Sequence, residues 1–392
     1  MELFQSEFDE PESQAIHLFR APGRTEIGGN HTDHQHGQVL AAGIDRDILA
    51  VAAYSAKSSR KIRIYSEGHG WIEFDLDKWA PGEIDPAEAG TAKALIHGMV
   101  DGMQKAGFRA EGFCAYIVSD VPGGAGISSS AAFEILIGTI INGMFNDDAA
   151  RAEEIAITAQ IAENLYYGKP SGLMDQMVSA VGGLCHIDFK DPAAPAVRKL
   201  DVDFSELGYC ICLTDTHGSH AEYTEDYTRV LEDLAAAASV FGKEFLVDVS
   251  QEDVVAHSRE IREAGSDRAF LRAMHVTAEN ERVAAEADAL ERKDATAFLK
   301  LVRESGDSSY KLLQNVHVDR KPERQELAVA LAISDAEGSS ASRVHGGGFA
   351  GTMQAFVPEA AVKEYIKIMD EAFGAGSCFV IRVCPEGGMQ LA

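Results

Sequence analysis

The chain has 392 residues, and 46% of them are hydrophobic, enough for a large core and for two domains. Its 62 acidic residues outnumber 35 basic ones, and the net charge of −27 opposes binding to nucleic acid or to anionic membranes. No apolar run is long enough for a transmembrane helix, and the acidic N-terminus does not resemble a signal peptide. Six cysteines without a C-x-x-C pair predict a cytoplasmic protein with reduced thiols. Nothing in the composition indicates an oligomeric state.

Hydrophobic periodicity predicts alternating strands and helices in the first half of the chain. The predicted strands are 38–55, 61–65, 71–74, 113–118, 184–189 and 209–213. The predicted helices are 91–107, 131–144, 151–167 and 173–181, with a break at 168–172 (GKPSG) between the last two.

The second half has the pattern of an α+β domain. We expect long amphipathic helices at 222–240, 273–292, 295–304 and 322–337, and strands near 352–357 and 377–384 that frame a last helix. The acidic stretch at 201–206 marks the expected boundary, which divides the chain into domains 1–200 and 201–392. There is no internal repeat or low-complexity segment.

Residues 122–132 (PGGAGISSSAA) are the most informative segment. Glycine amides can approach an anion closely, and serine hydroxyls can bind phosphate oxygens or a magnesium ion. Because a buried helix follows directly, the loop would place its ligand at a helix N-terminus, where phosphate is favoured. The alternative is a Gly-Ser surface turn. The loop has neither the P-loop lysine nor the spacing of G-x-G-x-x-G.

Three further segments concentrate polar side chains or glycines. Residues 21–34 (APGRTEIGGNHTDH) are either a polar turn or a ligand site, and their histidines with Asp33 could bind a metal together with His36. Glu163 and Asp175 flank the break at 168–172 and could share a magnesium ion, although each alone could be a solvated helix charge. Residues 342–351 (SRVHGGGFAG) form either a tight turn or a loop that faces a ligand.

Together, these four segments resemble the galactokinase family of the GHMP small-molecule kinases. Taken from the N-terminus to the C-terminus, they correspond to the family patterns A-P-G-R-V-N-L-I-G-E-H-T-D-Y, P-x-x-x-G-L-S-S-S-A-A, A-E-H-x-x-x-G-x-x-C-G-x-M-D-Q and G-A-R-x-T-G-G-G-F-G-G. The resemblance implies an α+β fold of two domains, with a mixed sheet in the N-terminal domain and a ferredoxin-like C-terminal domain. The active site would lie in the cleft between them.

The resemblance also implies ATP and Mg²⁺ as cofactors and transfer of the γ-phosphate to the anomeric hydroxyl of galactose or a close relative. Asp175 would face the sugar O1 as a base or electrostatic anchor, and Arg24 would keep it ionised. Ser130 and Glu163 would bind Mg²⁺. The ATP phosphates would be bound by Gly123, Gly124, Gly126, Ser128, Ser129 and Ser130. The sugar would be bound by Asn30, His31, Asp33, Gly172 and Tyr227, with Tyr223 as the alternative tyrosine.

The chain departs from the family pattern at several positions. Asn30 replaces a glutamate that contacts the sugar C6 hydroxyl, Glu26 stands where asparagine is usual, and His345 replaces threonine. Since an amide would not repel a C6 carboxylate, a galacturonate-type hexuronate 1-kinase is an alternative, and residues 31–35 (HTDHQ) resemble plant galacturonokinases. A non-catalytic sugar and ATP sensor is another alternative, although Arg24 and Asp175 are both present.

Overall fold

The computed structural model describes most of the chain. The described ranges are 2–8, 15–55, 60–79, 82–122, 126–218, 223–349 and 351–392. Within these ranges, no helix is both long and apolar enough to cross a membrane. Two of the predicted phosphate-binding residues, Gly123 and Gly124, lie outside the described residues.

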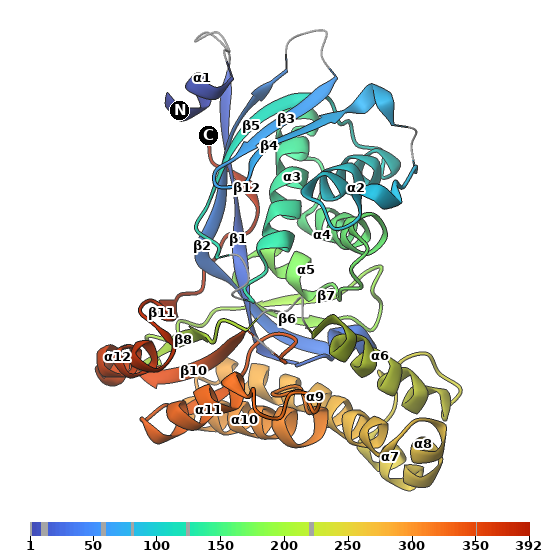
Figure 1. Ribbon diagram of the computed structural model, residues 1–392, viewed down its shortest axis with the longest axis vertical. Helices are drawn as coiled ribbons and strands as arrows, with labels where there is room; N and C mark the ends of the chain where they lie inside the picture. The colour runs from blue at the N-terminus through green and yellow to red at the C-terminus, as the bar shows by residue number, and fades with distance from the viewer. Residues whose placement is uncertain are drawn as a thin grey trace.

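In the described part of the chain, the larger sheet has eight strands and mixes antiparallel pairs with one parallel pair, β3 with β5 (Figure 1). Its order is β12-β1-β2-β5-β3-β4, and β6 pairs with both β2 and β7. The long β2 makes this branching possible, because residues 48–54 pair with β5 and residues 38–42 pair with β6. The strands are β1 (Ile16–Gly28), β2 (Gln38–Tyr54), β3 (Lys61–Ser66), β4 (Gly70–Asp75), β5 (Phe113–Ser119), β6 (Leu184–Asp188), β7 (Ala196–Leu200) and β12 (Met389–Gln390).

Helices cover one face of this sheet (Figure 1). They are α2 (Ala92–Lys105), α3 (Ser129–Asn146), α4 (Ala152–Ile161) and α5 (Met174–Val181), while the short α1 (Glu2–Glu7) lies near the N-terminus. Most of α3 is buried, which explains why its sequence is apolar on nearly every side. A helix of this kind must lie inside the domain, and it therefore supplies a rigid base for the loop before it.

The smaller sheet is antiparallel and has the order β11-β8-β10-β9. Its strands are β8 (Tyr209–Asp215), β9 (Ala341–Val344), β10 (Thr352–Pro358) and β11 (Cys378–Ile381). Cys210 and Cys212 both lie in β8, where residues two apart are on the same face of the strand. The helices of this half are α6 (Thr224–Ser239), α7 (Gln251–Ala256), α8 (Ser258–Ala264), α9 (Asp267–Glu291), α10 (Ala295–Ser308), α11 (Glu326–Ala336) and α12 (Val362–Phe373).

The C-terminal residues return to the larger sheet (Figure 1). The backbone N–H of Leu18 donates to Ala392 O at 2.8 Å, and the N–H of Leu391 donates to Leu18 O at 2.7 Å. The chain changes sheets between β7 and β8, but its last strand belongs to the first sheet. A division into domains 1–200 and 201–392 remains a proposal.

Two local structures differ from the expectations. Part of the segment considered as a polar turn is a strand, because residues 16–28 form β1. The second half of β1 is buried, so this part of the segment is not a surface turn. The helix expected over 151–167 is α-helical only to Ile161 and continues as a π-helical turn, η4 (Ala162–Tyr167). Single π-helical turns are frequent at functional sites, and this one contains Glu163.

Candidate active site

Arg24 and Asp175 form a bidentate ion pair between β1 and α5. Arg24 Nε lies 2.6 Å from Asp175 Oδ1, and Arg24 Nη2 lies 2.8 Å from Oδ2. The pairing of β1 with β2 shifts register on both sides of Arg24, a type of irregularity that redirects side chains next to active sites. Residues 151 positions apart in the sequence are thus brought into direct contact.

The same two side chains contact the glycine-serine loop. Arg24 Nη1 donates to Gly126 O at 2.6 Å, and the Ser128 hydroxyl donates to Asp175 Oδ2. Burial opposes ionisation of Asp175, but the charge and hydrogen bonds of Arg24, with the bond from Ser128, lower its pKa to about 2. Asp175 is therefore a carboxylate at neutral pH.

The loop ends at the N-terminus of α3. Ser128 has φ 60° and ψ 57°, a left-handed conformation that is costly for a residue other than glycine, and α3 begins at Ser129. The free N–H groups of a helix N-terminus favour a phosphate. Gly126 and Ser128 precede α3, and Ser129 and Ser130 begin it, so their binding of phosphate stays a prediction that this position favours.

Ser130, the second residue of α3, contacts Glu163 of η4. The Ser130 hydroxyl donates to Glu163 Oε1 at 3.1 Å, Lys169 Nζ donates to the same oxygen at 2.8 Å, and Gln176 Nε2 donates to Oε2 at 2.7 Å. Gln176 also donates to Glu134, whose pKa is raised by burial and by the charge of Glu163.

This donor set suits Mg²⁺. Magnesium prefers oxygen ligands and is usually bound by one or two carboxylates with substrate phosphates and water. A hydroxyl and a carboxylate within 3.1 Å fit that pattern. Among the described residues, no group of three or more His, Cys, Asp or Glu side chains could hold a metal, so the alternative metal site at His31, Asp33, His34 and His36 is not found.

Asp33 and Gly172 lie against each other beside a cavity. A Cβ atom at residue 172 would lie 1.8 Å from Asp33 Oδ2, so any other residue there would displace this carboxylate. The cavity has a volume of about 180 Å³. Its lining includes Asp33, His34, His36, Gly172 and Phe245.

His31 and Tyr227 contact the second glycine run. His31 Nε2 lies 2.9 Å from Gly347 O, and the Tyr227 hydroxyl donates to Gly348 O at 2.7 Å. Burial and the neighbouring His34 lower the pKa of His31 to about 3, so its ring is neutral and carries its proton on Nε2, since a carbonyl only accepts. The buried Nδ1 is then a bare acceptor, without a hydrogen-bond partner among the described residues.

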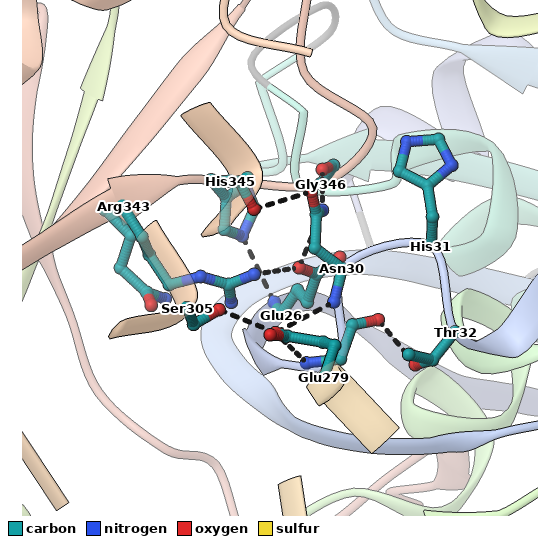
Figure 2. Close-up of polar contacts among 12 residues, drawn as sticks. Glu26, Asn30, His31, Thr32, Glu279, Ser305, Arg343, His345 and Gly346 are labelled. Carbon is teal, nitrogen blue, oxygen red and sulfur yellow. Dashed lines mark hydrogen bonds and ion pairs between the residues drawn. The ribbon is translucent and has the colours of Figure 1, made fainter. Parts of the chain in front are cut away.

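Asn30 is completely buried in a network that joins β1 to the second half of the chain (Figure 2). Its amide nitrogen donates to Glu26 Oε1 at 3.0 Å and to Gly346 O. Its oxygen accepts from Asn315 at 2.7 Å and from Ser309 at 3.3 Å. Figure 2 shows His31 directed away from this network. Both amide hydrogens of Asn30 are therefore used within the protein.

The rest of the network was not anticipated from the sequence. Arg343 Nη2 lies 2.6 Å from Glu26 Oε1, and Glu279 accepts from the backbone N–H of Gly29 at 3.1 Å and from the Ser305 hydroxyl at 2.6 Å. His345, which replaces the usual threonine, accepts from the backbone N–H of Glu26 at 3.2 Å. Glu279 has no sequence signal, since an acidic residue in an amphipathic helix is usually exposed.

Comparison with known proteins identifies related sequences. A family model described as the galactokinase galactose-binding signature matches residues 2–54, and one for the GHMP kinases N terminal domain matches residues 94–183. Galactokinase from Glaesserella parasuis is 30% identical over 95% of this chain and 94% of its own length. Galactokinase from Streptomyces coelicolor is 29% identical over 93% of this chain and 91% of its own length.

Solved structures match the fold over its whole length. The Lactococcus lactis galactokinase complexed with galactose has a TM-score of 0.84 at 24% identity, covering 100% of this chain and 98% of that one. The Methanococcus jannaschii mevalonate kinase has a TM-score of 0.63 at 17% identity, covering 96% and 100%. The fold is that of the GHMP kinases, as predicted, and the chain belongs to the galactokinase family.

Proposed function

We propose that the protein transfers the γ-phosphate of ATP to the anomeric hydroxyl of galactose. The observation that carries the proposal is the convergence of Arg24 and Asp175 with the loop that leads into α3. Phosphoryl transfer depends on alignment and charge neutralisation, and this arrangement supplies both. A cytoplasmic location, where ATP is available, follows from the proposed reaction.

In the proposed mechanism, the Asp175 carboxylate accepts a hydrogen bond from the sugar O1 hydroxyl and orients it toward the phosphate. Arg24 keeps Asp175 ionised and adds positive charge where charge develops. The N-terminus of α3, with Ser128 and Ser129, binds the phosphates. Ser130 and Glu163 would hold Mg²⁺, which would neutralise phosphate charge. Asp33, His31, Tyr227 and the backbone of Gly172 would hold the sugar hydroxyls.

Two observations favour a hydroxyl over a carboxylate at C6, and they concern Asn30, whose counterpart in the family contacts the C6 hydroxyl, and the next residue, His31. His31 Nδ1 is a bare acceptor, which attracts a hydroxyl hydrogen and disfavours a carboxylate. Asn30 has no amide hydrogen left to donate to a carboxylate. The galacturonate alternative therefore has no support from the site, and the sensor alternative has none because the reacting groups are assembled.

The departures from the family pattern at residues 26 and 30 exchange an amide and a carboxylate between these two positions. The family has an amide at the first position and a carboxylate at the second, whereas this chain has Glu26 and Asn30, joined by a hydrogen bond of 3.0 Å. The carboxylate has thus moved to the position where it pairs with Arg343. We infer that Asn30 preserves the network rather than recruiting a charged sugar.

An assay coupled to ADP formation tests the function, with galactose, galacturonate and N-acetylated sugars as acceptors. We expect galactose to be phosphorylated, with kcat/KM for galacturonate lower by about 100-fold or more, equivalent to about 2.7 kcal/mol. Asn30→Glu alone would place two carboxylates side by side, so we expect it to lower activity on both sugars. Glu26→Asn with Asn30→Glu should recover part of the galactose activity. A preference for galacturonate would overturn the assignment of the sugar, and no phosphorylation of any sugar would overturn the kinase.

A further inference from the structure

Lys169 contacts the carboxylate that would bind the metal. Its Nζ lies 2.8 Å from Glu163 Oε1, the oxygen that also accepts from Ser130. The Glu163 side chain is 1% exposed, whereas that of Lys169 is 55% exposed. The family pattern specifies no residue at position 169, so the resemblance gives this lysine no role.

The position of the ammonium group is incompatible with a metal at the same oxygen. Glu163 Oε2 is directed to Gln176, which leaves Oε1 and the Ser130 hydroxyl to face the metal. An ammonium group and a divalent cation on one carboxylate oxygen would be like charges only a few ångströms apart, and they repel strongly in a partly buried site.

Glu163 nevertheless needs a cation when no metal is bound. The Glu163 side chain is almost fully buried, and a buried carboxylate without a cationic partner is costly. Lys169 Nζ lies 2.8 Å from that carboxylate, and an exposed lysine with an acidic partner carries its positive charge at neutral pH. Its long stem and exposed position let it leave without moving the backbone.

We propose that the Lys169 ammonium group and the divalent metal ion are alternative partners of Glu163. The lysine neutralises the carboxylate in the nucleotide-free protein, and it turns away when the metal arrives. Lys169 is thus a positioning residue that keeps the metal site assembled between turnovers. This inference rests on the metal site of the proposed function.

Thermal unfolding with Mg²⁺ as the probe tests the exchange without any sugar or turnover. In EDTA, Lys169→Met should lower Tm by about 2–4 °C, because Glu163 loses its partner in a partly exposed pair. Mg²⁺ at 10 mM should restore most of that loss, while it should change the wild-type Tm by only about 1 °C. Lys169→Arg should behave like the wild type in EDTA.

Lys105 provides a matched control. It pairs with Asp101 Oδ2 at 2.6 Å, with side-chain exposures of 60% and 4%, and the hydroxyl that donates to the same oxygen belongs to Tyr166 rather than to a serine at the start of α3. Lys105→Met should therefore lose stability that Mg²⁺ does not restore. The double variant Lys169→Met with Glu163→Gln should lose the rescue by Mg²⁺, because the metal has no carboxylate to bind.

The outcomes separate this inference from the proposed function. A Tm loss in Lys169→Met that Mg²⁺ restores supports the exchange. No loss in EDTA, or a loss that Mg²⁺ leaves unchanged, overturns it and makes Lys169 an ordinary ion-pair partner. Since turnover on galactose is measured separately in the wild type, either result leaves the kinase assignment standing.

Discussion

The proposed phosphate site and the network around Asn30 both depend on ion pairs that join distant segments, but they differ in exposure. The side chain of Asp175 is 24% exposed in its pair with Arg24, whereas Arg343 is 0% and Glu26 is 3% exposed in theirs. The first pair contacts the loop before α3, and the second joins β1 to β9 beside Glu279 of α9. We therefore expect changes in the first to affect turnover and changes in the second to affect stability.

Both regions also contain a π-helical turn. Glu163 lies in η4, and Ser309, which contacts Asn30, begins the π-helical turn η6 (Ser309–Leu313). In each case the extra residue in the turn accompanies a buried polar side chain that contacts another segment. The two regions thus share a π-helical turn, although one turn belongs to the proposed ligand site and the other to the packing between the two sheets.

The largest expected effect is on turnover. Asp175→Asn removes the charge that orients the sugar hydroxyl, so kcat should fall by about 10²–10⁴-fold while ATP binding and fold persist. Steady-state kinetics and nucleotide titration measure the two quantities. Asp47→Asn is the control, because Asp47 pairs with Arg20 at similar side-chain exposures of 28% and 12%, and it should keep normal turnover. A near-normal kcat in Asp175→Asn would show that Asp175 does not orient the sugar hydroxyl.

In the buried network, Arg343→Met should destabilise the protein. It leaves Glu26 buried without its partner, and losing one member of a buried pair costs about 3–5 kcal/mol. Urea unfolding measures the change. The double variant Arg343→Met with Glu26→Gln should recover part of the loss, since no uncompensated charge remains. A loss below about 1 kcal/mol in the single variant would contradict the comparison between the two regions.

His31 should make stability depend on pH. Its pKa is about 3 in the folded protein but about 6.5 when unfolded, so the unfolded state binds more protons between these values. Stability therefore falls as the pH falls below about 6.5, with a loss of about 2 kcal/mol by pH 5. His31→Gln should remove this part of the dependence, and His69→Gln, at an exposed turn, should leave it intact. Parallel pH profiles for wild type and His31→Gln would exclude the effect.

The smallest expected effect is a gain in stability. Neither carboxylate oxygen of Glu286 has a partner among the described residues, and burial with the charge of Glu279 raises its pKa well above the usual value. Because the unfolded chain ionises first, the wild type loses stability as the pH rises above about 4.5. Glu286→Gln should gain about 1 kcal/mol at pH 8 and nothing at pH 4. Glu281→Gln, exposed on the same helix, is the control; an equal gain there would contradict the prediction.

Local sequence patterns predicted many elements well. The buried helix α3 and strand β5 have continuous apolar runs, and the structure has them within a few residues of the predicted bounds. β1 was not predicted, because its polar residues Arg24, Thr25 and Glu26 obscure the strand pattern and are buried only through partners elsewhere. The short α7 and α8 have too few residues for a clear helical period.

The motifs by themselves predicted the reacting groups, because the chemistry of phosphate transfer requires glycines, serines, a carboxylate and an arginine at restricted spacing. Only the tertiary structure decided what Asn30 does, since its four hydrogen bonds come from segments as far apart as Glu26, Ser309, Asn315 and Gly346. The same holds for Lys169, whose contact with Glu163 depends on the turn between them. A side chain's identity limits the bonds it can form, but the fold determines which partners are within reach.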